Sequence, residues 1–275
     1  MNLLVATAAF TFLATAFFGD KSPSEKRAPK ETIRVLPVGR TPEPSTAALA
    51  IAIPRDGAAL NGNPVWVQLR VDGYTLGSDS QFGRADELVN SEMGQTVHVV
   101  VDDLPYFPVN EPAIDPFNED GFYYDMSYKF QLPFRLKEGA HTLRLFLARS
   151  FGESLKGERV FQAINFSIGD SNGSLRDLSG PYVTYNEPSD NFDLVESKPV
   201  LLDFFISNCE LSPDGYKVRV SVDGKATRTL IAWQPYYIYG LKKGKHTIRL
   251  ELLDSRNQVV PGPFNNVENS FTVHS

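Results

Sequence analysis

The chain has 275 residues, of which 42% are hydrophobic and 22% are charged, and its formal net charge is −6. This composition is typical of a globular protein, and the length predicts one or two domains. An acidic chain lacks the basic surface that nonspecific nucleic-acid binding needs. Its single cysteine excludes an intramolecular disulfide and cysteine metal clusters.

The first 19 residues carry no charge and are strongly apolar. As a helix, Leu3 to Gly19 would be about 25 Å long, which is near the lower limit for spanning a bilayer. Residues 14–16 read Ala-Thr-Ala and resemble a signal-peptidase site, so a cleaved signal peptide and an uncleaved anchor are both open. In an anchor, the membrane-embedded side chains would include Leu3, Leu4, Phe10, Phe12, Leu13, Phe17 and Phe18.

The basic residues follow this segment rather than precede it, which by the positive-inside rule would place the body of the chain in the cytoplasm. Long domains cross the membrane largely regardless of flanking charge. We therefore expect the body to be exported to the periplasmic side of the cytoplasmic membrane. The alternative is release into the periplasm after cleavage.

Residues 20–46 contain five prolines and many charges, with little apolar periodicity. Such a segment is typical of an extended tether. The pattern predicts that this tether holds a folded body away from the membrane.

Short strand-like runs begin at Ala47 and are separated by Gly, Pro, Asn and Asp. Apolar residues alternate with other residues in these runs, which indicates strands with one buried face. In the first half, the predicted strands lie within residues 47–54, 64–73, 96–103, 141–148 and 162–169. In the second half, they lie within residues 199–208, 216–224, 236–241, 246–254 and 269–273.

The two halves repeat each other over about 100 residues. Residues 130–147 (FQLPFRLKEGAHTLRLFL) match residues 235–252 (PYYIYGLKKGKHTIRLEL), and a polar Gly/Ser stretch separates the halves. The sequence predicts an all-β protein of two tandem immunoglobulin-like β-sandwiches. Their ranges are 47–169, with an insertion at about 104–128, and 182–275, joined by a linker at 170–181.

The repeat contains a histidine in each copy, His141 and His246. Two such residues could form halves of one chemical site or the same structural element of a duplicated domain. Each follows a glycine turn, and its spacing in the strand predicts that it points to the same face as the apolar residues. We interpret both as structural residues at the core edge.

Enzyme signatures are absent: the chain has no G-x-S-x-G, P-loop, G-x-G-x-x-G or H-E-x-x-H motif. We therefore expect a non-enzymatic protein without a cofactor. Carboxylates in the insertion offer weak candidate ligands for Ca²⁺, although their spacing does not match an EF-hand: Asp115, Glu119 and Asp120.

Aromatic residues gather in the insertion and in a second segment that reads WQPYYIY. Exposed aromatic side chains form contact surfaces for proteins or sugars, and long loops on a rigid scaffold tend to carry function. The predicted partner-binding residues are Tyr106, Phe107, Phe117, Phe122, Tyr123, Tyr124, Trp233 and Tyr236.

Several long motifs, among them GAHTLRLFLARSFGESLKG and AWQPYYIYGLKKGKHTIRLELLD, resemble a group of poorly characterised bacterial envelope proteins. These are lipoproteins or secreted proteins with tandem immunoglobulin-like repeats, sometimes labelled phosphopeptide-binding. The resemblance covers about residues 94–273. The lipid-bearing cysteine is absent here, and Phe151 and Gly152 stand where such proteins often have a histidine. No compact arginine cluster supports phosphopeptide recognition.

These patterns lead to two hypotheses. The first is a non-enzymatic, membrane-anchored subunit of a larger assembly of envelope proteins. The second is a soluble periplasmic module that binds a carbohydrate or a divalent ion through the insertion, and an enzyme is a remote third.

Overall fold

The computed structural model describes residues 32–111, 127–169 and 174–275, and residues 32–275 form one compact unit. The described chain is almost entirely β-structure, with sixteen strands and one four-residue helix, α1 (Arg84–Glu87). The predicted all-β class is confirmed. The N-terminal helix and anchor, residues 1–19, lie outside the described residues, as do residues 20–31. No helix in the described part of the chain is long and apolar enough to cross a membrane.

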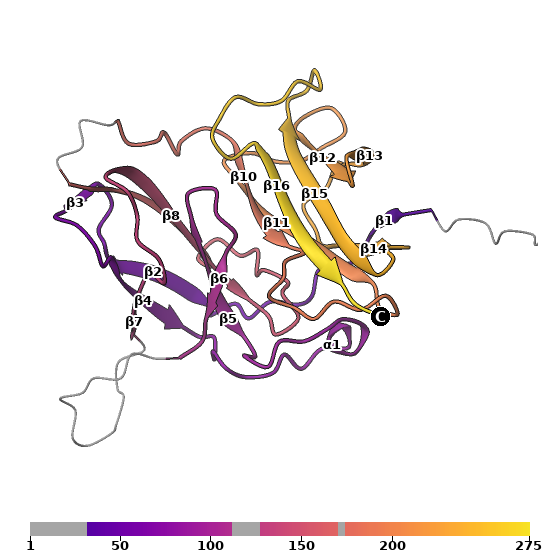
Figure 1. Ribbon diagram of the computed structural model, residues 1–275, viewed down its shortest axis with the longest axis horizontal. Coiled ribbons are helices and arrows are strands. Elements are labelled where there is room, and N and C mark those ends of the chain that lie inside the picture. The colour runs from indigo at the N-terminus through magenta and orange to yellow at the C-terminus, as the bar shows by residue number, and fades with distance from the viewer. Residues whose placement is uncertain (1–31, 112–126, 170–173) are drawn as a thin grey trace, which may run out of the picture. The chain divides into compact units, whose positions relative to one another are not determined.

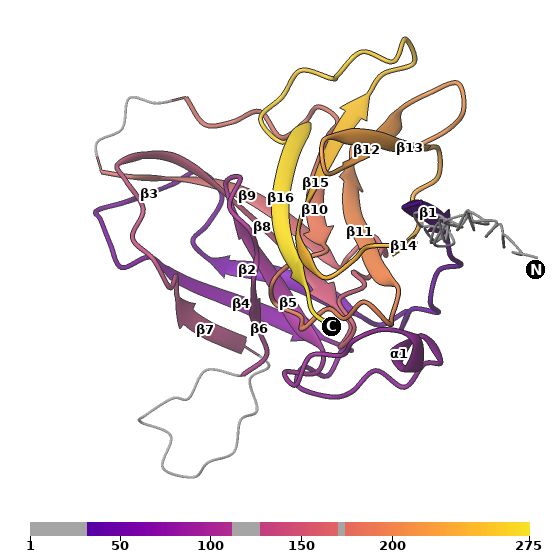
Figure 2. The ribbon, with the colours of Figure 1, turned by 45° about the vertical axis from the view of Figure 1, so that its right-hand side comes forward.

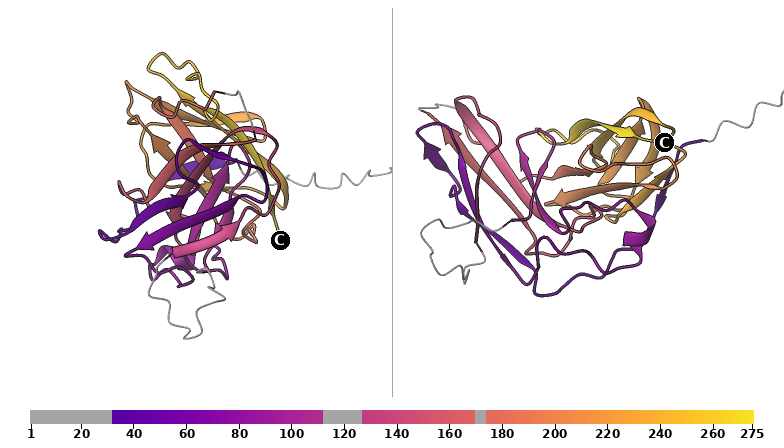
Figure 3. Two further views of the ribbon diagram at one scale, coloured as in Figure 1. Left: turned by 90° about the vertical axis from the view of Figure 1, so that its left-hand side faces the viewer. Right: turned by 60° about the horizontal axis from the view of Figure 1, so that its bottom comes forward.

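The first two sheets enclose one hydrophobic cluster, and Figure 3 shows their indigo and magenta strands together. The three-stranded sheet has the order β2 (Ala48–Ile53), β4 (Trp66–Asp72), β7 (Ser127–Gln131). The five-stranded sheet has the order β3 (Ala58–Leu60), β9 (Phe161–Ile168), β8 (Gly139–Ala148), β5 (Thr96–Val101), β6 (Phe107–Val109). Alternate residues of these strands, such as Leu69, Val99 and Leu145, fill the space between the sheets.

The other two sheets enclose a second cluster, and their strands are orange and yellow in Figure 2, apart from β1. One sheet has the order β1 (Arg34–Pro37), β14 (Tyr236–Tyr239), β11 (Val200–Ser207), β10 (Tyr182–Glu187). The other has the order β13 (Lys225–Leu230), β12 (Lys217–Val222), β15 (Gly244–Leu253), β16 (Asn266–Val273). Every strand expected from alternation is present in one of the four sheets.

Strand β1 lies within the range that the sequence assigns to the tether. Its four residues pair antiparallel with β14, and Val35 is buried in the second cluster. Figure 1 shows β1 beside β14. The extended tether predicted for residues 20–46 is therefore wrong from Arg34 on, because backbone pairing and an apolar side chain fix this short segment to the sheet.

Both ends of the predicted insertion are also strands. β6 pairs with β5, and β7 pairs with β4. The stretch between residues 112 and 126, which contains most of the insertion, lies outside the described residues.

Two of the four sheets, the five-stranded sheet and the β1-β14-β11-β10 sheet, are covered on both faces, and we call them the middle sheets. In β5, β10 and β11 every residue is buried, and in β8 the last eight are. By contrast, β15, the repeat counterpart of β8, alternates between buried and exposed residues. A strand that is buried throughout has a layer on each face. The five-stranded sheet and the β1-β14-β11-β10 sheet thus pack against each other, and Phe161 of β9 stacks on Phe205 of β11 at 4.3 Å.

The two histidines of the repeat form the same contacts in both copies. His141 Nδ1 lies 2.7 Å from Asp102 Oδ2 and its Nε2 lies 2.9 Å from the carbonyl oxygen of Lys137. His246 makes the corresponding contacts with Asp223 at 2.9 Å and with the Lys242 carbonyl at 2.7 Å.

Each aspartate also accepts a hydrogen bond from the backbone N–H that follows the histidine. Both aspartates have a positive φ, 54° and 49°, and the glycines before the histidines have φ of 133° and 137°. The motif is a structural clip that joins the end of one strand to the start of its neighbour in the sheet, β5 to β8 and β12 to β15. No contact between the two histidines exists in the structure, which agrees with the structural interpretation.

We predict that His141→Ala and His246→Ala each lower the free energy of unfolding by about 1–3 kcal/mol, because each removes two hydrogen bonds, one of them to an aspartate. Urea unfolding of the full chain measures this. Arg249→Ala is the matched control: its ion pair with Glu268 is exposed, and we expect a change within about 0.5 kcal/mol. Unchanged stability in both histidine variants would contradict the prediction.

Candidate functional site

The segment that follows β8, RSFGESLKG at residues 149–157, lies between the two middle sheets. It turns back on its own strand through a bridge between Ala148 and Ser154. Gly152 makes the turn with φ of 85°, and a Cβ there would lie 3.0 Å from the side chain of Glu187. The turn requires a glycine because both the backbone conformation and the available space exclude a side chain.

This turn places Ser154 and Lys156 against Asp203 of β11, which is fully buried. Asp203 Oδ1 accepts a hydrogen bond from Lys156 Nζ at 2.7 Å. Its Oδ2 accepts from the Ser154 backbone N–H at 3.1 Å, from Ser154 Oγ at 2.5 Å and from Asn186 Nδ2 at 2.8 Å. We call these four residues the junction. Their polar groups satisfy one another, as groups buried without water must.

A serine beside a lysine can act as a nucleophile and its base. Here the Ser154 hydroxyl donates to Asp203 rather than to the lysine, and Lys156 Nζ itself donates to Ser154 O, Ser154 Oγ and Asp203 Oδ1. Both side chains are also closed to solvent. The geometry gives the pair a structural role.

A second buried polar group lies beside the junction. The ring of His98 stacks on that of Tyr106 at 3.7 Å, and His98 Nδ1 lies 2.7 Å from Asn186 Oδ1. The hydroxyl of Tyr106 donates a short hydrogen bond to Glu187. Burial lowers the pKa of His98 to about 4 and raises the pKa of Glu187 to about 8. At neutral pH both side chains are therefore mostly uncharged.

The N-terminal segment that follows β1 connects to the same region. Thr41 donates its backbone N–H and its hydroxyl to the buried carboxylate of Glu153, at 3.2 and 2.7 Å. Arg84, the first residue of α1, forms an ion pair with Glu153 at 2.5 Å. Glu43 Oε1 accepts the backbone N–H of Lys156 at 2.7 Å. Residues 38–46 therefore connect the two pairs of sheets along their contact.

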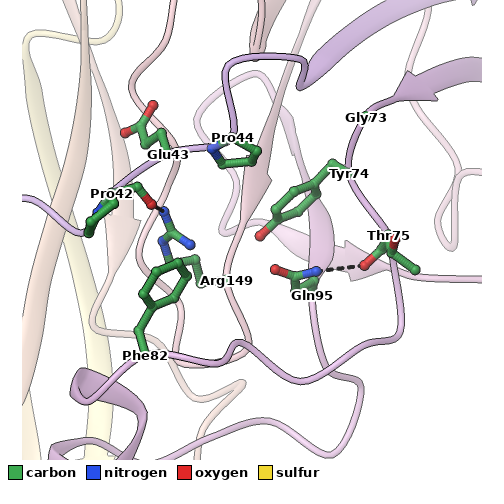
Figure 4. A pocket seen from close by; sticks show the side chains of 9 residues that line it. All are labelled: Pro42, Glu43, Pro44, Gly73, Tyr74, Thr75, Phe82, Gln95 and Arg149. Atoms are coloured by element: carbon green, nitrogen blue, oxygen red, sulfur yellow. Dashed lines mark hydrogen bonds between the residues drawn. The ribbon is translucent and has the colours of Figure 1, made fainter.

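An open pocket of about 420 Å³ lies beside this segment (Figure 4). Its walls include Pro42, Pro44, Tyr74 and Phe82, and its polar groups include Gln95 and Arg149. The guanidinium group of Arg149 lies 4.5 Å from the centre of the Phe82 ring. Within the described chain, this pocket combines solvent access with a buried cationic group, which makes it the candidate binding site.

Three of the four described aromatic residues proposed as a contact surface have roles inside the molecule. Tyr106 and Tyr236 are only 5% and 3% exposed, and the hydroxyl of Tyr236 donates to the Ala232 carbonyl at 2.8 Å. Trp233 is partly buried between the two hydrophobic clusters, and its Nε1 donates to the Phe204 carbonyl at 3.0 Å. These three rings pack inside the molecule because the second layer covers the sheet faces that carry them.

Phe107, the fourth, is partly buried and contacts Phe130 and Phe134 edge to face. The remaining predicted contact residues lie outside the described residues: Phe117, Phe122, Tyr123 and Tyr124. The same holds for the candidate metal ligands Asp115, Glu119 and Asp120. Among the residues that the structure describes, no group of three or more His, Cys, Asp or Glu side chains could hold a metal ion.

Sequence reasoning missed Arg149, Asp203 and the pocket. The acidic, serine and lysine residues of the RSFGESLKG segment were visible, but no period or spacing pairs them with a strand 50 residues away. A buried charge within an apolar strand, such as Asp203 in VLLDFFIS, is the one signal that points to the junction.

Comparisons with protein-family models and with curated proteins give no match. Among solved structures, the chain is similar to the fibronectin(III)-like modules of CbhA from Clostridium thermocellum, with 13% identity, a TM-score of 0.27, and 82% of this chain and 92% of that chain covered.

A second structure is SGBP-B from a mixed-linkage glucan utilization locus of Bacteroides ovatus, in complex with a mixed-linkage heptasaccharide. The identity is 14%, the TM-score is 0.19, and 83% of this chain is covered. The match spans about half of that protein, at 48%.

We predict that Lys156→Met lowers the free energy of unfolding by about 3–5 kcal/mol, because it leaves the carboxylate of Asp203 buried without a counter-charge. Arg219→Met is the control, since the Arg219–Glu251 pair is partly exposed and should contribute less than about 1 kcal/mol. Equal losses in the two variants, measured by urea unfolding, would contradict a special role for the junction.

We also predict that stability falls as pH rises from about 6.5 to about 8. Unfolded Glu187 has lost its proton in this range while folded Glu187 keeps it, so the folded state binds more protons. His98 has the opposite effect, but only between about 4 and 6.5. Over the 1.5 units in which Glu187 acts alone, the expected loss is about 2 kcal/mol.

Unfolding free energies at pH 6.5 and pH 8 test this, and Glu187→Gln should remove most of the difference. Glu196→Gln is the matched control, because a hydrogen bond from the Lys243 backbone lowers the pKa of Glu196 and keeps it charged throughout this range. An unaltered pH slope in Glu187→Gln would contradict the assignment.

Proposed function

We propose that this chain is a non-enzymatic extracytoplasmic protein that acts as a structural or accessory subunit of a larger membrane assembly. In this proposal, residues 1–19 anchor it to the periplasmic side of the cytoplasmic membrane. The folded part consists of two immunoglobulin-like sandwiches, which correspond to the two repeats and the two hydrophobic clusters.

The observation that carries the proposal concerns the serine, lysine and aspartate that could have formed a catalytic site, because their side chains bind one another inside the molecule. Ser154, Lys156 and Asp203 are hydrogen-bonded to one another and closed to solvent. Their placement supports a role in holding two sandwiches in one fixed arrangement. A rigid pair of sandwiches suits a spacer or scaffold more than a catalyst.

Exposed strand edges support an interaction role. β13 is an edge strand in which five of the six residues are at least partly exposed. An extended segment of a partner can pair with such an edge through backbone hydrogen bonds. Strand β1, which pairs with β14, shows the same kind of addition within the chain itself.

We predict that the full chain, expressed in a Gram-negative host, fractionates with membranes and is digested by protease added to spheroplasts. N-terminal sequencing should find Met1, because an anchor is not cleaved. A chain that begins with a cleavable signal followed by residue 32 is the matched control and should appear in the soluble periplasmic fraction.

In the native bacterium, the detergent-solubilised chain should migrate with other proteins on native gels. A soluble monomer that starts near Phe17 would contradict the proposal. It would favour the soluble module that binds a carbohydrate or a divalent ion, which a thermal-shift screen with glycans and Ca²⁺ then tests.

A further inference from the structure

Arg149 is a buried cation without an anionic partner. The residue is 2% exposed, and it forms no ion pair within the part of the chain that the structure describes. Its guanidinium donates one hydrogen bond, from Nη2 to the Pro42 carbonyl at 2.5 Å, and its Nε has no partner. Buried arginines are rare unless they are paired, so this side chain has unused hydrogen-bonding capacity.

Arg149 lies in the wall of a space that a ligand can enter, although its unpartnered Nε is itself closed to solvent. Arg149 lines the open pocket, where Figure 4 shows its guanidinium between Phe82 and Pro42, on the side toward Tyr74. The ring of Phe82 supports one face of the guanidinium at 4.5 Å. This contact helps to hold the planar group in one orientation.

Two carboxylates lie near Arg149, and one of them, that of Glu43, belongs to a residue that lines the pocket itself. Glu153 binds Arg84 and Thr41, and Glu43 accepts the backbone N–H of Lys156. Both still influence Arg149 through space. They would repel a doubly charged anion more than a singly charged one.

We propose that the pocket binds a small molecule through a carboxylate group, which takes the position of the missing counter-ion of Arg149. A carboxylate is planar and singly charged, and it matches the guanidinium fork with two parallel hydrogen bonds. The proline and tyrosine walls contact the body of the ligand, and the Gln95 amide lies at the polar side of the pocket. This site is independent of any membrane anchor or partner protein.

Pairs of compounds that differ only in the carboxylate test the proposal on the full chain. Glucuronate is compared with glucose, and N-acetylphenylalanine with its amide, by isothermal titration calorimetry up to 10 mM. The first pair represents an acidic sugar and the second a peptide C-terminus. We expect at least one acid to bind at least about tenfold more tightly than its neutral counterpart, since hydrogen bonds to a charged group are lost in the latter.

Two kinds of variant keep the test decisive. Arg149→Lys retains the charge but loses the fork, and it should weaken acid binding by about tenfold or more. Thr75 is an exposed lining residue, so its substitution should not affect folding. Thr75→Glu places a competing carboxylate at the pocket and should weaken binding, whereas the equally large Thr75→Gln should weaken it less.

Circular dichroism melting confirms that each variant is folded. Equal affinity for acid and neutral compound, or no binding of either acid at 10 mM, overturns the proposal. So does a Thr75→Glu variant that binds the acid as well as Thr75→Gln does.

Discussion

The arrangement of the described chain depends on one buried ion pair. Lys156 and Asp203 lie between two sheets, and neither side chain has contact with solvent. Taking both charges out of water costs several kcal/mol per ion, which their attraction offsets only if the remaining donors and acceptors are also satisfied. Ser154 and Asn186 supply those partners. Because the pair works in one geometry only, it sets how the sheets lie against each other.

The duplicated motif shows how one sequence pattern serves two environments. Arg144 and Arg249 occupy equivalent positions after the two histidines. Arg249 is exposed and pairs with Glu268 across the sheet. Arg144 is buried, donates to the Thr184 hydroxyl at 2.9 Å, and lies 3.6 Å from the centre of the Phe264 ring. The clip itself is unchanged because it joins two strands that are neighbours within one sheet in both copies. The contacts of the arginine differ because another layer covers Arg144 and not Arg249.

Alternation of apolar residues predicted most strands correctly because each contributes one face to a hydrophobic cluster. It missed β1, β3, β6, β7 and β13, which are short or largely exposed and carry little apolar signal. It also missed β10, whose residues are buried on both faces. Tyr106 and Tyr236 were assigned to a surface for a related reason. The local sequence around an aromatic residue in a loop or at a strand end does not show whether another layer covers its ring.

The sequence by itself determined the all-β class, the repeat and the equivalent positions of its two histidines, because these depend on strand period and on turns between neighbouring residues. Only the tertiary structure decided which sheet faces meet, which buried charges satisfy each other, and that Arg149 lines a pocket. Those features join residues about 50 to 110 positions apart, such as Ser154 with Asp203 and Pro42 with Arg149. The physical reason is that burial of a polar side chain depends on partners that local sequence does not specify.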